Sequence, residues 1–233
     1  MDRIAKLWLL PLDDAASREA AQGWPLLSAD KQARLLRFRR EEDRLRGLWA
    51  ELLLRSVVCR ELGWSNRDIS FVFNAYGKPQ LAGGSSFHFN VSHSGGWIAC
   101  LADRQSVGVD VEAHAPVEPA LAQACFCEEE LAFLNVSSPG SEDWTRRFFR
   151  LWTAKESAVK ALGKGLSVPL PSFSVLPALV GDGRVALEDG EYRLRELSVD
   201  PAYSLAACCS PESVWEGVEI ADAESVLAEA GRR

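Results

Sequence analysis

The sequence predicts an α+β fold of two pseudo-symmetric lobes, each a small antiparallel sheet packed with a long helix. Long helical patterns occupy residues 28–62 and 144–162, and each is accompanied by several short alternating segments that are typical of strands. The two sets meet near residues 103–107. We therefore expect an N-terminal lobe over residues 1–105 and a C-terminal lobe over residues 106–233, although no sequence repeat is visible.

The first half of the chain contains the elements of one lobe. In order, we expect a strand at residues 4–9, helical turns over 28–62 with a break near 38–42, and strands at 69–73, 87–91 and 97–102. Leu48 and Leu52 lie at the spacing of a buried helix face, and Gly63 is placed to end that helix. Phe87 and Phe89 alternate with polar residues, as in a strand with one buried face.

The second half contains a similar set. In order, we expect a strand at 107–112 that forms a hairpin with the strand at 97–102, helices at 128–135 and 144–162, and strands at 173–176, 185–187, 192–197 and 204–209. Phe148, Leu151 and Ala158 can form the buried stripe of the long helix. Gly163 is placed to end it.

Composition narrows the class of protein. A chain of 233 residues, 47% hydrophobic and 25% charged, is long enough for a buried core. Its net charge of −7 argues against a nucleic-acid-binding protein. Basic residues are nevertheless concentrated at 31–46 and 146–164, which suits a compact polyanion or an acidic protein partner.

Targeting signals and cysteine spacing indicate the compartment. No stretch approaches the roughly 20 apolar residues of a membrane span, and the apolar start is too short for a secretory signal. The six cysteines contain no C-x-x-C pair, so we expect reduced thiols rather than a zinc site. We therefore expect a cytoplasmic protein that contacts no membrane.

Two pairs of charged residues are the candidate functional groups. Asp110 and Glu112 are two residues apart on a predicted strand, so their side chains share one face. Glu156 and Lys160 are four apart on a predicted helix and also share a face. Either pair alone could be a solvated surface feature. If the fold brings them together, they form an oxygen-ligand site for a hard divalent cation beside an ammonium group, which suits a phosphate ester.

Four segments carry a family resemblance. They are YGKP at 76–79, FNVSHSG at 89–95, VGVDVE at 107–112 and LWTAKESAVKALGKGL at 151–166. In this order they resemble the 4'-phosphopantetheinyl transferases of the surfactin-synthetase-activating type. The similarity extends over roughly residues 28–210. It implies the two-lobed fold of that family and a monomer with coenzyme A bound between the lobes.

The resemblance implies a reaction. Such enzymes transfer the 4'-phosphopantetheine arm of coenzyme A to a serine of an apo acyl- or peptidyl-carrier protein, and release 3',5'-ADP. By resemblance Asp110, Glu112 and Glu156 hold Mg²⁺, with Mn²⁺ as the alternative, and Lys160 supports the pyrophosphate. The base that activates the carrier serine is left open among Glu130, Glu156 and a metal-bound water.

The resemblance also assigns residues to coenzyme A. They are Lys31, Arg34, Gly77, Lys78, Pro79, Ser92, His93 and Lys160. Lys31 and Arg34 match residues that bind the 3'-phosphate, a use of charge-assisted hydrogen bonds. His93 matches a phosphate contact, and Lys78 matches a residue at the nucleotide.

Two other functions remain open from the sequence. One is a catalytically silent protein that binds coenzyme A or carrier proteins, and the other is a metal-dependent phosphohydrolase. The intact acids and Lys160 argue against a silent protein. The sequence does not tell a fatty-acid carrier from a polyketide or nonribosomal-peptide carrier.

Overall fold

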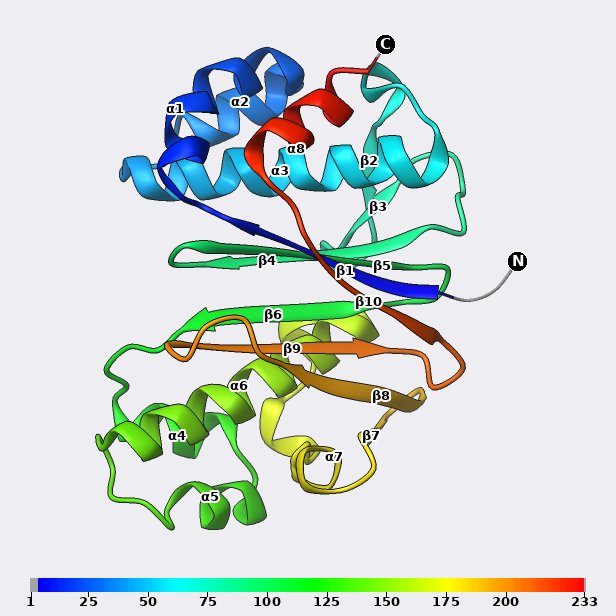
Figure 1. Cartoon of the computed structure of the whole chain (residues 1–233). Coiled ribbons are helices and arrows are strands. Elements are labelled where there is room, and N and C mark those ends of the chain that lie inside the picture. Colours follow the sequence, from blue (N-terminus) through cyan, green and yellow to red (C-terminus); the bar gives the residue numbers. More distant parts are fainter. Residues whose placement is uncertain (1–3, 233) are drawn as a thin grey trace.

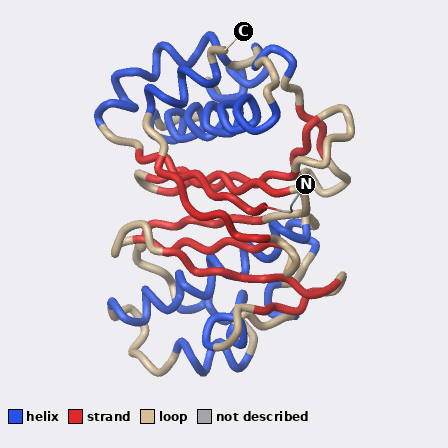
Figure 2. The backbone as a smooth tube through the Cα atoms, turned by 45° about the vertical axis from the view of Figure 1, so that its right-hand side comes forward, coloured by secondary structure: helices blue, strands red, loops and turns tan. Residues whose placement is uncertain are grey.

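The computed structural model describes residues 4–232, whose elements stack in the order helices, sheet, sheet, helices (Figures 1 and 2). This confirms the predicted α+β fold of two lobes. Within the described residues each lobe contains one four-stranded sheet, and a separate two-stranded hairpin belongs to the first lobe. No helix among these residues is both long and apolar enough to cross a membrane.

The first lobe contains the sheet with strand order β10-β1-β5-β4. Its strands are β1 (Ile4–Pro11), β4 (His88–Ser94), β5 (Trp97–Asp103) and β10 (Val214–Ile220), and the hairpin is formed by β2 (Phe71–Phe73) and β3 (Pro79–Leu81). Its helices are α1 (Asp14–Gly23), α2 (Ala29–Leu35), α3 (Glu41–Leu62) and α8 (Ala223–Ala230), with short 3₁₀ turns at Trp24–Leu26 and Asn66–Asp68. These helices cover the outer face of the sheet (Figure 1).

The second lobe contains the sheet with strand order β6-β9-β8-β7. Its strands are β6 (Gly108–Ala113), β7 (Arg184–Leu187), β8 (Gly190–Leu197) and β9 (Tyr203–Cys209). Its helices are α4 (Pro119–Cys125), α5 (Glu128–Leu134), α6 (Glu142–Leu162) and α7 (Leu176–Val180), with 3₁₀ turns at Gly165–Ser167 and Leu170–Ser172.

Each interface between layers has its own apolar core. In the first lobe the helix α3 packs on the sheet through residues such as Trp49 and Leu52. In the second lobe α6 does so through Phe148 and Leu151. A third core lies between the two sheets and includes Val109 on β6. The valines of β6 therefore face the other sheet, and its even-numbered residues face α6.

The two sheets are also joined along β4 and β6, which lie side by side (Figure 1). Three polar side chains of β4 accept hydrogen bonds from backbone amides of β6. The pairs are Asn90 Oδ1 with Val109 N (2.8 Å), Ser92 Oγ with Val111 N (3.3 Å) and Ser94 Oγ with Ala113 N (3.1 Å). These side chains satisfy amides on the edge of β6 that has no partner strand. We call this row of contacts the seam.

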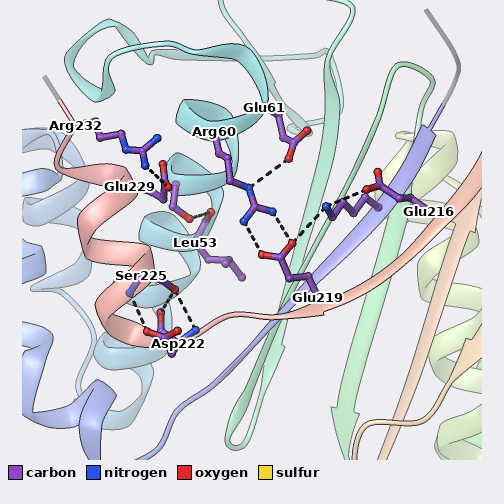
Figure 3. Close-up of polar contacts among 11 residues, drawn as sticks. Leu53, Arg60, Glu61, Glu216, Glu219, Asp222, Ser225, Glu229 and Arg232 are labelled. Atoms are coloured by element: carbon purple, nitrogen blue, oxygen red, sulfur yellow. Dashed lines mark hydrogen bonds and ion pairs between the residues drawn. The ribbon is translucent and has the colours of Figure 1, made fainter.

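The chain returns to the first lobe after the second lobe is complete. β10 pairs in parallel with β1, so the first sheet is not purely antiparallel. Arg60 of α3 binds both carboxylate oxygens of Glu219 on β10, at 2.5 and 2.7 Å (Figure 3). Lys6 of β1 lies 3.3 Å from the same carboxylate. Asp222 then caps α8 by accepting from Ser225 N. The boundary predicted for the C-terminal lobe, residues 106–233, is therefore wrong for residues 214–230.

Two other expectations are wrong. The strands at 97–102 and 107–112 form no hairpin, because both edges of β5 are taken by β1 and β4 and β6 pairs with β9 instead. Residues 173–176 form no strand, because α7 starts at Leu176 with a proline in its first turn. The elements α1, α4, α8, β3 and β10 were not predicted from the sequence.

Gly108 marks the closest approach of α6 to β6. A Cβ atom at this position would lie 2.0 Å from the carbonyl oxygen of Ser157 and 2.4 Å from the amide nitrogen of Ala161. Both atoms are helix backbone and cannot rotate away. The absence of a side chain at Gly108 is therefore what lets the helix that carries Glu156 and Lys160 lie against the strand that carries Asp110.

We predict that Gly108→Ala lowers the free energy of unfolding by about 3 kcal/mol or more, because the methyl group forces α6 off β6. Urea unfolding followed by circular dichroism measures this. Gly96→Ala is the matched control, since the nearest atom to its added Cβ is 3.7 Å away. Equal stability of the two variants would contradict the proposed close contact.

Candidate functional site

Asp110 is the buried centre of the candidate site. It lies on β6 and is 2% exposed. Its Oδ1 atom accepts a hydrogen bond from Ser92 Oγ at 2.9 Å and pairs with Lys160 Nζ at 2.5 Å. Its Oδ2 atom is buried and has no hydrogen-bond partner among the described residues. A buried carboxylate oxygen without a partner is costly, so this atom is a candidate ligand for a cation.

The charge of Asp110 affects two further carboxylates. Burial raises the pKa of Glu112, and the negative charges of Asp110 and Glu156 raise it further. Burial also raises the pKa of Glu156, again with a contribution from Asp110. Within residues 4–232 Glu156 has no hydrogen bond or ion pair. Asp110 thus raises the pKa of both glutamates, as like charges do in sites that hold a cation.

These carboxylates are the type of ligand that a hard cation binds, because Mg²⁺ prefers a few carboxylate oxygens together with phosphate and water. As the side chains stand, no group of three His, Cys, Asp or Glu residues in the described part of the chain is arranged to hold a metal ion. The ammonium of Lys160 instead neutralises Asp110. The observation in favour of a cation is the orphaned Oδ2 atom of Asp110.

Lys160 joins the two lobes at this point. Besides Asp110, its ammonium donates to Ser92 Oγ at 3.3 Å and to the carbonyl of Val109 at 3.2 Å. Ser92 is one of the seam residues of β4. The carboxylate cluster therefore lies directly at the seam, on the α6 side of β6.

A pocket of about 660 Å³ lies in the first lobe, between α2, α3, the β2–β3 hairpin and β4. Of the residues assigned to coenzyme A, the ones that line it are Lys31, Arg34, Gly77, Pro79 and His93. Its lining residues all lie between 28 and 93, so the pocket belongs to the first lobe and not to both. Ser92 and Lys160 lie at the carboxylate cluster instead.

The pocket is also lined by two charged residues, Glu51 and Arg55, that were not predicted from the sequence as site residues. Glu51 on α3 pairs with Lys31 at 3.0 Å and with Arg55 at 2.8 Å. Glu51 and Arg55 are only 8% and 4% exposed. Their signal in the sequence was an oppositely charged pair at i and i+4 within the apolar run of α3. Glu51 keeps the Lys31 ammonium at the pocket wall.

Lys78 does not line this pocket, although Gly77 and Pro79 on either side of it do. Its ammonium instead lies 2.7 Å from the carbonyl of Lys160 and 2.9 Å from that of Val107, in the second lobe. The Lys78 ammonium therefore lies outside this pocket, and its assignment to the nucleotide by resemblance stays a prediction.

Glu130 is fully buried in the second lobe. Its Oε2 atom lies 2.8 Å from Lys155 Nζ and accepts from Cys127 N at 3.0 Å, and its Oε1 atom accepts from Val175 N at 2.8 Å. Lys155 in turn donates to the carbonyls of Leu170 and Phe173. Both oxygens of Glu130 are thus engaged in holding α5 and residues 170–175 against α6.

The arrangement as a whole suits phosphate chemistry. Cationic groups of Lys31 and Arg34 line a pocket on one side of the seam, and Asp110 with its neighbouring carboxylates lies on the other. Ser92 belongs to β4, which also contributes His93 to the pocket. A ligand with a phosphate group at each of two places along its length fits such a pair of sites.

Comparison with known proteins agrees with this chemistry. A family model described as 4'-phosphopantetheinyl transferase, N-terminal, matches residues 15–105, and one described as the 4'-phosphopantetheinyl transferase superfamily matches residues 106–208. The relatives include the 4'-phosphopantetheinyl transferase Sfp of Bacillus subtilis, 33% identical over 227 residues, or 95% of this chain and 100% of the relative.

Other relatives agree. The 4'-phosphopantetheinyl transferase psf-1 of Bacillus pumilus is 35% identical over 228 residues, or 97% of each chain. The 4'-phosphopantetheinyl transferase HetI of Nostoc is 33% identical over 167 residues, or 69% of each chain. The resemblance noted in the four motifs is confirmed. The chain belongs to the 4'-phosphopantetheinyl transferase superfamily and is an enzyme of this kind, a phosphopantetheinyl transferase.

Proposed function

We propose that this enzyme transfers the 4'-phosphopantetheine arm of coenzyme A to a serine of an apo carrier protein, in an Mg²⁺-dependent reaction that releases 3',5'-ADP. The observation that carries the proposal is the buried, unpartnered oxygen of Asp110 beside Glu112, Glu156 and Lys160. Coenzyme A has phosphate at both ends of its nucleotide, which corresponds to the cationic pocket and the carboxylate cluster across the seam.

The pocket would take the nucleotide half of coenzyme A. Lys31 and Arg34 supply positive charge for the 3'-phosphate. His93 stands on the wall nearest the seam, because it neighbours Ser92 in β4, and suits the next phosphate along the ligand. Gly77 and Pro79 also line the pocket.

Asp110, Glu112 and Glu156 would hold Mg²⁺ or Mn²⁺. When bound, the ion would neutralise charge on the pyrophosphate. Lys160 would turn one ammonium hydrogen from Asp110 to the pyrophosphate, because the ammonium has three hydrogens and its side chain is 27% exposed. The hydroxyl of Ser92 holds Asp110 in place from the other lobe.

The carrier serine must lose its proton as its oxygen attacks the phosphorus that bears pantetheine. In that step the new Ser O–P bond forms, the bond from phosphorus to the ADP oxygen breaks, and 3',5'-ADP leaves with the electron pair. We assign the proton to Glu156, whose carboxylate has no hydrogen-bond partner among the described residues. Glu130 is left out because both of its oxygens are engaged in the core.

We further propose that the enzyme is a cytoplasmic monomer acting on acyl-carrier or peptidyl-carrier proteins. The described cysteines are all unpaired, which accords with a reducing compartment. An acidic carrier suits the basic residues in and after α2, such as Arg34, which lines the pocket, and Arg37, since opposite charges favour encounter.

We predict that Glu156→Gln lowers the rate of carrier modification about 100-fold or more, because it removes both a cation ligand and the proton acceptor. Intact-mass spectrometry of an apo carrier incubated with coenzyme A and Mg²⁺ measures the gain of one phosphopantetheine group. Glu142→Gln, an exposed acid in the first turn of the same helix, is the matched control and keeps the wild-type rate. A normal rate in Glu156→Gln would remove the proposed role, and coenzyme A cleavage without a carrier would indicate a hydrolase.

We predict that removal of divalent ions abolishes transfer and that added Mg²⁺ or Mn²⁺ restores it. Asp110→Asn should raise the Mg²⁺ concentration needed for half-maximal rate about 10-fold or more, since loss of a carboxylate weakens the ion site. The rate is measured against metal concentration after treatment with a chelator. Full activity in excess chelator would contradict a metal-dependent reaction.

A further inference from the structure

The side chain of Lys78 leaves the pocket wall and crosses to the second lobe. Its ammonium is within hydrogen-bond distance of four oxygen atoms. They are Ser106 Oγ at 3.2 Å and the carbonyls of Val107 at 2.9 Å, Lys160 at 2.7 Å and Ala161 at 3.4 Å. An ammonium has three hydrogens, so these four acceptors outnumber its donors, and a nucleotide phosphate would have to compete with all four for one of them.

The carbonyls of Lys160 and Ala161 belong to the last turn of α6. The last carbonyls of any helix have no partner within the helix and need one from elsewhere. Ser106 Oγ donates to the carbonyl of Ala161, and Asn74 Nδ2 donates to the carbonyl of Gly163 at 2.9 Å. Lys78 is thus the charged member of a cap that comes from outside the helix, at the end where the helix dipole favours a cation.

The absence of a side chain at Gly163 leaves room for the side chain of Lys78. Gly163 ends α6 with a positive φ of 76°, and a Cβ atom there would lie 3.2 Å from Lys78 Cδ. The stem of Lys78 therefore packs on the glycine while its ammonium reaches the carbonyls behind it. Burial lowers the pKa of Lys78 to about 8, so the group carries its charge at neutral pH.

The turn that carries Lys78 also builds the pocket. Gly77 and Pro79 line the cavity between α2, α3 and β4. Asn74 accepts from the amides of Tyr76 and Lys78 and so fixes the turn. Within residues 74–79, Gly77 and Pro79 therefore line the pocket, while the side chains of Asn74 and Lys78 contact the end of α6.

We propose that Lys78 is a positioning residue: its ammonium fixes the end of α6 to the pocket wall, and so holds Glu156 and Lys160 in register with the bound cofactor. The part of this inference that concerns coenzyme A rests on the proposed function. It differs from the role implied by resemblance, in which this lysine contacts the nucleotide.

The test compares Lys78→Met with Lys31→Met by two measurements at pH 7. The first is amide hydrogen exchange of the last turn of α6, in protein without coenzyme A or metal. The second is kcat and KM for coenzyme A. Methionine keeps the length of the stem and removes the charge. In Lys78→Met we expect exchange about 10-fold faster, since a charged cap is lost. We also expect kcat about 10-fold lower or more, since α6 shifts, with KM changed less than about three-fold.

Lys31→Met should show the opposite pattern. Its KM for coenzyme A rises, because a pocket cation is lost, and exchange in α6 stays at the wild-type rate. If Lys78→Met behaves like Lys31→Met, or if its exchange rises with kcat unchanged, the positioning role is overturned. Because exchange is measured without ligand, it tests the cap even if the assignment of the pocket to coenzyme A is wrong.

Ser106→Ala serves if Lys78→Met fails to fold. It removes a hydroxyl that donates to Ala161 and accepts from Lys78, and it does not line the cofactor pocket. We expect a smaller rise in exchange at the same turn and a fall in kcat without a change in KM. Wild-type exchange and kcat in this variant would overturn the proposal.

Discussion

The seam between β4 and β6 is the constraint on which the rest of this molecule depends. An unpaired strand edge needs hydrogen-bond partners, and here Asn90, Ser92 and Ser94 provide them with side chains rather than with another strand. Side-chain pairing keeps the two sheets distinct, so each retains its own helical cover. It also brings polar residues of the first lobe into contact with β6 of the second lobe, which carries Asp110 and Glu112.

The charge balance of the site follows from this geometry. Asp110 lies at the seam and is almost completely buried, which alone would favour its neutral form. Ser92 and Lys160 favour the charged form from the two sides. Glu112 and Glu156 add negative charge, so the cluster holds more acid than the one ammonium neutralises. A cation between these groups would remove that excess.

The sequence predicted the parts of the fold that are local and periodic. The spacing of Asp110 and Glu112 predicted that they share one face of β6, and the spacing of Glu156 and Lys160 predicted a shared helix face. It did not predict β10, because this strand pairs with β1 from more than 200 residues away, and Gly217 and the acids beside it weaken its strand pattern. The motifs identified Lys78 and Glu130 as candidate site residues, but they did not predict which way the two side chains point. The Lys78 side chain lies against helix carbonyls and that of Glu130 against Lys155, because a buried charged group needs polar partners.

The late return of the chain to the first lobe has a consequence for biogenesis. Residues 214–230 leave the ribosome after the whole of the second lobe. Until then the first sheet lacks β10, so one edge of β1 is unpaired and Arg60 lacks its partner Glu219. The second lobe has all of its strands before that moment. The lobe that is translated first is thus completed last, and until then the open edge of β1 can bind chaperones or pair with a wrong strand.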